Sequence, residues 1–266
     1  MPSQADVIDF EIIGEDLQAI IVTLDPGEAV VAEAGAMMYM EEGIEMGTQL
    51  SLREGKGVFG KLLDAGKRVL VGESFFITMF GNNAGQRRDV AFAAPYPGRV
   101  VPLELGDHGG TLLCQKDSFL CAARGIDIGI AFTRRIGTGL FGGEGFILQK
   151  LTAPGGRGQA FLHAGGTILS RRLERGETLR VDTGCLVAFE PSVDYDIQMV
   201  PGIRNKIFGG EGLFFVRLTG PGTVWLQTLP FSRLADRVIA SAPTSGGRSV
   251  GEGSILGGLG RILDGD

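Results

Sequence analysis

The residues that most often build catalytic and metal centres are scarce in this chain. Its 266 residues include two histidines, His108 and His163, and three cysteines, Cys114, Cys121 and Cys185. A zinc site needs about four ligands at set spacing, and these cysteines form no CxxC pair. We therefore expect structural or surface roles for all five, with no catalytic residue, bound metal or cofactor. A Cys–His nucleophile pair stays open as an alternative, but no motif supports it.

Long apolar segments are also missing. No run of about 18 apolar residues occurs, so no transmembrane helix is expected. Residues 1–10 lack a basic segment followed by an apolar one, which predicts no secretory signal. An odd number of cysteines without a regular framework favours reduced thiols. Together these features predict a cytoplasmic protein.

Clustered positive charge is limited. The formal net charge is −6, and the arginine pairs at 87–88, 134–135 and 171–172 are scattered along the sequence. Binding to RNA or DNA through phosphates needs clustered Lys and Arg, so we expect no nucleic-acid partner.

The nucleotide-binding motifs are incomplete. The segment Gly142–Gly145 is glycine-rich, but a phosphate-binding loop needs Gly-Lys followed by Ser or Thr. A dinucleotide fingerprint needs a strand–helix–strand context, for which the pattern gives no support. The sequence therefore predicts a protein that is not an enzyme.

What the chain has in abundance is glycine, placed between short alternating segments. Glycine makes up 44 of 266 residues, well above the usual ~7%. Residues 7–12, 17–24, 75–80 and 146–151 are rich in β-branched or aromatic residues and are followed by turn residues. These are strand-and-turn signals, and they predict an all-β fold.

Helical signals are few. Residues 59–70 fit a short amphipathic helix weakened by two glycines, and residues 230–241 fit another short helix. The favoured interpretation of both is packing against the edge of a sheet.

The chain also repeats itself. Leu24–Glu28 matches Leu173–Glu177 at an offset of 149 (173 − 24), and Gly43–Met46 matches Gly125–Ile128 at an offset of 82 (125 − 43). A unit of this size is marginal alone, so we expect its copies to share buried surface. The prediction is three small units, each like a β-sandwich or a double-stranded β-helix, packed side by side.

A second motif, Gly-Glu before an apolar or aromatic segment, recurs once in each copy. One interpretation is a carboxylate that accepts backbone N–H bonds at a tight bend, or pairs with a basic residue of the next unit. The other is a pocket between repeats for a small ligand. The candidate residues are Glu73, Glu144, Glu211, Gly72, Gly143 and Gly210.

These matches define the expected domains. The first repeat spans 1–96 with a glycine-rich insertion near 53–70, the second spans 97–163 and the third 164–242. Residues 243–266 are glycine-rich and are expected to form a flexible tail.

Four segments carry a family resemblance: Glu33–Met38, Gly72–Phe76, Ala94–Gly98 and Phe141–Gly145. Through them the chain, over about residues 5–230, resembles the altered-inheritance-of-mitochondria family of bacterial and mitochondrial proteins. That resemblance implies a triplicated version of the subunit fold of the tryptophan RNA-binding attenuator protein. It also implies a homotrimer whose nine β-units close into a ring. The attenuator's basic RNA-contacting residues have no match in this chain.

Three functional hypotheses follow. The first is a non-enzymatic oligomeric scaffold or binding protein, in which ring closure removes exposed sheet edges. The second is a small-ligand sensor that uses clefts between repeats, by analogy with the attenuator fold. The third is a peripheral membrane-organising protein that uses residues 59–70 or the apolar residues of the tail.

Overall fold

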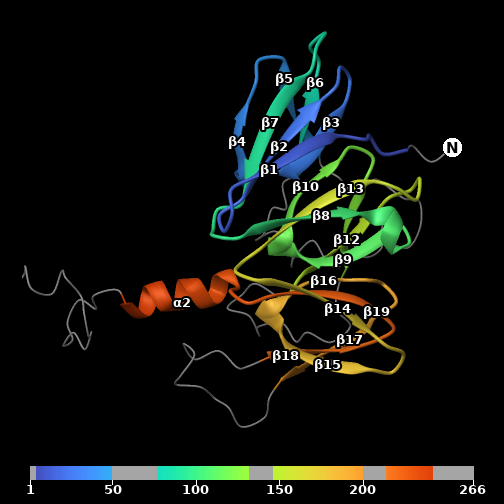
Figure 1. Ribbon diagram of the computed structural model, residues 1–266, viewed down its shortest axis with the longest axis vertical. Helices are drawn as coiled ribbons and strands as arrows, with labels where there is room; N and C mark the ends of the chain where they lie inside the picture. Colours follow the sequence, from blue (N-terminus) through green and yellow to red (C-terminus); the bar gives the residue numbers. More distant parts are fainter. Residues whose placement is uncertain (1–3, 50–76, 132–145, 200–213, 242–266) are drawn as a thin grey trace, which may run out of the picture. The chain divides into compact units, whose positions relative to one another are not determined.

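The computed structural model describes residues 4–49, 77–131, 146–199 and 214–241 (Figure 1). Contacts divide the chain into two compact units, Met1–Pro230 and Phe231–Asp266. The described part of the second unit is one helix, α2 (Phe231–Ser241), which confirms the helix predicted within residues 230–241. All the strands that the structure describes lie in the first unit. The all-β class is therefore confirmed.

After an initial strand, β1 (Asp9–Ile13), the strands fall into three sets of six. The first set is β2 (Ala19–Leu24), β3 (Ala29–Glu33), β4 (Met37–Met40), β5 (Ile44–Gln49), β6 (Ile77–Asn82) and β7 (Arg88–Ala93). The second set is β8 (Arg99–Glu104), β9 (Thr111–Gln115), β10 (Phe119–Ala123), β11 (Asp127–Ala131), β12 (Leu148–Thr152) and β13 (Gln159–Ala164). The third set is β14 (Ile168–Leu173), β15 (Thr178–Asp182), β16 (Leu186–Phe189), β17 (Asp194–Met199), β18 (Phe214–Thr219) and β19 (Gly222–Gln227).

Each set follows the same antiparallel pairing scheme. Its sixth strand pairs with its first and third, and its fifth strand pairs with its second and fourth. A short 3-10 turn joins the second strand to the third in every set: η1 (Ala34–Ala36), η3 (Lys116–Ser118) and η4 (Thr183–Cys185). The starts of these turns are separated by the offsets of 82 (116 − 34) and 149 (183 − 34) found in the sequence.

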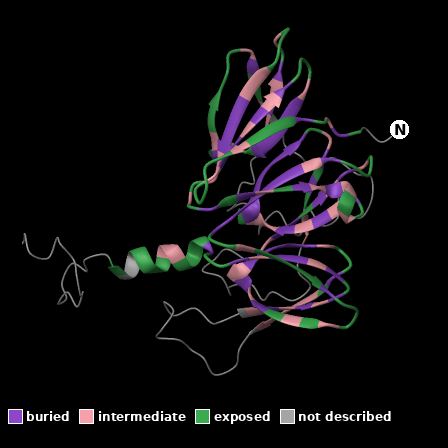
Figure 2. Cartoon of the chain, in the orientation of Figure 1, coloured by how far each residue is buried: buried purple, intermediate pink, exposed green. Residues whose placement is uncertain are grey.

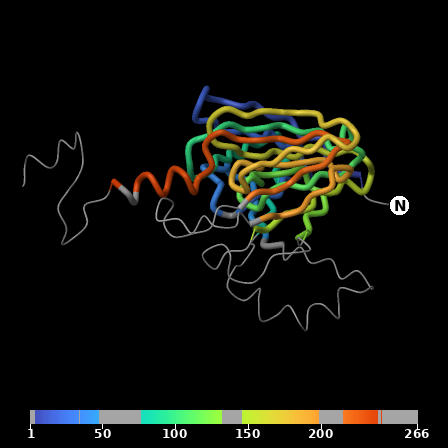
Figure 3. Tube along the Cα trace, turned by 90° about the horizontal axis from the view of Figure 1, so that it is seen from below, coloured from blue at the N-terminus to red at the C-terminus, as the bar shows by residue number. Residues whose placement is uncertain are grey.

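Neighbouring sets are joined by strand pairing. β3 pairs with β10, and β9 pairs with β16, so two six-stranded sheets each take three strands from one set and three from the next. We call these junctions seam 1–2 and seam 2–3. In Figure 1 the sets follow one another in chain order, and in Figure 3, seen from below, their strands overlie one another.

The two remaining sheets are smaller. One has the order β1-β2-β7-β4, and the other has the order β15-β18-β17. In strand position they correspond to the two halves of a seam sheet, with β1 added to the first. The first of these sheets ends on β4, and the second ends on β15. The strands equivalent to β4 are β10 and β16, and the strands equivalent to β15 are β3 and β9; all four are paired across a seam.

Buried apolar side chains fill the space between the sheets. Phe80, Phe92, Phe161 and Phe189 are among the largest fully buried residues. The strand β2 alternates as its sequence predicts, with Ile20, Val22 and Leu24 fully buried. The predicted strands at 7–12, 17–24, 75–80 and 146–151 overlap β1, β2, β6 and β12, respectively. Local alternation thus located these strands, and in β2 the alternation reflects one face that packs on the core.

Candidate functional site

The candidate turn residues lie outside the described residues. This applies to all six: Glu73, Glu144, Glu211, Gly72, Gly143 and Gly210. The predicted helix at 59–70 and the tail at 243–266 also fall outside them. The chemistry that the structure does display lies at the seams and at the two strands that end the smaller sheets.

At seam 1–2 a short N-terminal segment binds across the junction. The backbone N–H of Asp6 donates to the carbonyl of Arg124 at 2.9 Å, and the Asp6 carboxylate accepts the N–H of Ala29 at 2.9 Å. The Arg124 guanidinium forms an ion pair with the Asp6 carboxylate at 3.0 Å and donates a hydrogen bond to the carbonyl of Gly27 at 2.8 Å. Residues from both strand sets are thus joined through one carboxylate that is 17% exposed.

Seam 2–3 is joined by a different pair. Nδ1 of His108 lies 2.9 Å from Oε1 of Glu190, and Oε2 of Glu190 accepts the N–H of Thr223 at 3.0 Å. The His108 ring packs edge-on against Trp225, with centroids 5.0 Å apart. Burial alone would raise the pKa of Glu190, but the hydrogen bonds from His108 and Thr223 hold that pKa below its ordinary value.

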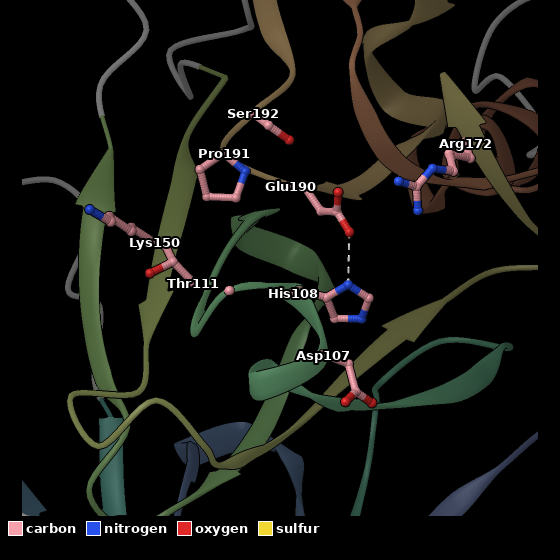
Figure 4. Close-up of a pocket in the computed structure, with 9 residues that line it drawn as sticks. Asp107, His108, Thr111, Lys150, Arg172, Glu190, Pro191 and Ser192 are labelled. Atoms are coloured by element: carbon pink, nitrogen blue, oxygen red, sulfur yellow. Dashed lines mark hydrogen bonds and ion pairs between the residues drawn. The ribbon is translucent and has the colours of Figure 1, made fainter. Parts of the chain in front are cut away.

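A surface cavity of about 570 Å³ opens beside this pair (Figure 4). Lys150 and Arg172 lie on opposite sides of it, with Glu190 between them and already bonded to His108. The lining is mostly polar and also includes Thr111 and Ser192. The cationic groups do not converge on one point, so the cavity presents no assembled anion site.

Glu190 is a seam residue that the sequence analysis missed. The offset of 149 relates it to Glu41 (190 − 41), in the corresponding turn of the first set. Oε2 of Glu41 accepts the N–H of Asp89 at 3.0 Å, just as Oε2 of Glu190 accepts that of Thr223. Applying the offset beyond the matched segments could have found this relation.

The third strand of the first set differs sharply from its counterparts. Met38, Tyr39 and Met40 of β4 are 55%, 43% and 38% exposed, whereas every residue of β10 and β16 is buried. Figure 2 shows this contrast between the exposed β4 and the buried strands of the seams. The counterparts are buried because a neighbouring set covers them, and within the described chain no set covers β4.

The histidine and cysteine side chains are dispersed. Cys114 and Cys121 are fully buried, and burial raises the pKa of both thiols. His163 is 1% exposed beside Tyr96, at a ring separation of 4.6 Å, and burial lowers its pKa to about 4. In the described segments no group of three or more His, Cys, Asp or Glu residues is placed to hold a metal ion. None of the helical segments described there is long and apolar enough to cross a membrane.

Comparison with known proteins gives consistent matches over most of the chain. The family model described as "Mitochondrial biogenesis AIM24" matches residues 10–229. An uncharacterized protein of Streptococcus pyogenes serotype M6 is 31% identical over 226 residues, covering 84% of this chain and 86% of that protein. The crystal structure of a Streptococcus pyogenes protein has a TM-score of 0.68 at 26% identity, covering 89% of this chain and 100% of that one.

Proposed function

We propose that this chain, which belongs to the mitochondrial biogenesis AIM24 family, is a non-enzymatic scaffold. It would work as a homo-oligomer. The number of chains, three, and their closure into a ring are what the resemblance to the attenuator fold implies. The observation that carries the proposal is the exposed apolar strand β4.

An uncovered strand of this kind favours association. β4 has the sequence Met-Met-Tyr-Met and pairs with β7 on one side, and no strand among the described residues pairs with its other edge. An apolar edge strand is a ready template for pairing with another chain, and natural proteins usually protect such edges with charge, proline or a covering element. β4 itself carries no charged residue or proline. Its burial in an oligomer would remove both the exposed backbone groups and the exposed side chains.

The test measures mass in solution and the effect of a charge on β4. We expect light scattering at micromolar concentration to give a mass of about three chains of 28.1 kDa each. Tyr39→Lys should shift the protein to monomer, because a buried unpaired ammonium opposes association. The matched control is Leu169→Lys in β14, because Leu169 is also a large exposed strand residue, with an exposed fraction of 52%. A monomeric wild-type protein, or an unchanged mass in Tyr39→Lys, would contradict the proposal.

A further inference from the structure

We propose that β4 pairs in antiparallel fashion with β15 of a second copy, and that Glu41 of one copy binds Arg175 of the other. This inference rests on the proposed function and names the partner surface and the contacts of that assembly. It is drawn from the two seams already present inside the chain.

The two smaller sheets are complementary halves. At seam 1–2 the sheet order is β5-β6-β3 followed by β10-β13-β8, and at seam 2–3 it is β11-β12-β9 followed by β16-β19-β14. By strand position, β17-β18-β15 is the first kind of half and β4-β7-β2 is the second. Joining β15 to β4 of another copy therefore builds a third seam sheet. The contact uses two different surfaces, so it is head to tail and can close into a ring.

The internal seams also fix the register. Ala32 lies opposite Cys121 at seam 1–2, and Cys114 lies opposite Ala188 at seam 2–3. Adding 82 to Ala32 gives Cys114, and adding 67 (149 − 82) to Cys121 gives Ala188, so the two seams have the same register. By the same arithmetic, Tyr39 of β4 (121 − 82) lies opposite Val181 of β15 in the second copy (32 + 149), and Met40 therefore lies opposite its Arg180.

The carboxylate of Glu41 uses one oxygen within its own chain and can accept a hydrogen bond with the other. It has the pose of Glu190, with one carboxylate oxygen on the N–H of Asp89 at 3.0 Å. At seam 2–3 the second oxygen of Glu190 is bonded to His108 at 2.9 Å. Among the residues that the structure describes, none donates to the second oxygen of Glu41. In the proposed seam between β15 and β4, a donor at the position equivalent to His108 would bind this second oxygen of Glu41.

Arg175 occupies that position on the third set. His108 precedes Gly109 (φ +71°), and Arg175 precedes Gly176 (φ +79°), the corresponding left-handed glycine of its turn. Arg175 is exposed and has no acceptor in the described part of the chain. The neighbouring cation Arg171 is already paired with Glu177 at 2.6 Å. Arg175 would therefore supply the charge-assisted bond that His108 supplies at seam 2–3.

The first experiment exchanges the two charges. Glu41→Arg and Arg175→Glu should each weaken self-association at least tenfold by sedimentation, because like charges then meet at the seam. The double variant restores an Arg–Glu pair at every contact and should recover most of the affinity. Glu11→Arg, an exposed residue of β1, controls for the change in net charge. Unchanged association in both single variants, or no recovery in the double variant, would overturn the Glu41–Arg175 contact.

The second experiment tests the register by cross-linking. In a Cys185→Ser background, Tyr39→Cys with Val181→Cys should form a disulfide between chains on mild oxidation, because directly opposed residues lie within disulfide range. The control pair, Tyr39→Cys with Leu179→Cys, is two residues out of register. Cross-linking of the control alone, or of neither pair in a protein that still oligomerises, would overturn the register and leave the scaffold standing. A wild-type monomer would instead remove the proposed function.

Discussion

At the scale of single residues, buried polar groups at the seams are expected to matter more than exposed ion pairs. The Asp6 side chain is 17% exposed and accepts a backbone N–H as well as the Arg124 guanidinium. The Asp16 side chain is 85% exposed and contacts Arg99 at 2.7 Å. Exposed pairs contribute about 0–1 kcal/mol, whereas orphaning a buried donor costs about 1–3 kcal/mol.

The first prediction follows from this contrast. Asp6→Ala leaves the N–H of Ala29 without its acceptor, so it should lower the free energy of unfolding by about 1–3 kcal/mol. Asp16→Ala is the control, with an expected loss below about 1 kcal/mol. Urea denaturation of both variants measures the difference. Equal losses would show that the N-terminal segment does not stabilise seam 1–2.

The second prediction concerns pH. Burial lowers the pKa of His163 to about 4, against 6.5 when it is unperturbed, so the unfolded chain binds more protons between these values. The contribution of His163 to the free energy of unfolding is therefore fully present above pH 6.5 and is lost as the pH falls to 4. His163→Gln, which does not titrate, should show a shallower fall in melting temperature across that range. An identical pH dependence in the variant would rule out His163 as a source of acid instability.

At the scale of elements, the edge strands differ in how they are covered. β1 pairs with β2 over five residue positions and so covers the outer edge of the first set. β10 and β16 are covered by β3 and β9 of the preceding sets. Only β4 among the three corresponding strands leaves large apolar side chains in solvent, within the residues described. The location of the proposed contact is thus a property of whole strands rather than of one side chain.

At the scale of the whole molecule, assembly and stability are expected to be coupled. Anything that binds the folded state but not the unfolded state stabilises it by mass action, and in the proposed assembly the ligand is another copy of the chain. A protein that buries β4 only in an oligomer therefore has a stability that depends on its own concentration.

The third prediction states this coupling as a measurement. The melting temperature of the wild-type protein should rise as its concentration is raised from about 1 to 100 μM, because dilution favours dissociation and unfolding. Tyr39→Lys should melt at a temperature that does not depend on concentration. Calorimetry over this range measures both. A wild-type melting temperature that stays constant over this range would show that the stability of the fold does not depend on assembly.

Local patterns predicted individual strands better than they predicted the site. The alternation at 17–24 predicted β2, and a short helix was found within residues 230–241, because both signals depend on near neighbours. The domain boundaries at 96 and 163 stay predictions, as do the roles of the repeated Gly-Glu motifs. Glu41 and Arg175 were not singled out, because neither belongs to a local motif of known chemistry.

The sequence by itself determined the all-β class, the family and the offsets of 82 and 149. These depend on residue types and spacing, which are properties of the chain before it folds. Only the tertiary structure decided that β3 joins β10, that β9 joins β16, and that β4 and β15 end their sheets. The reason is that β4 is apolar throughout, as its covered counterparts β10 and β16 are, so residue types alone do not tell which of these edges is paired. Which edge meets which depends on contacts between residues far apart in the chain.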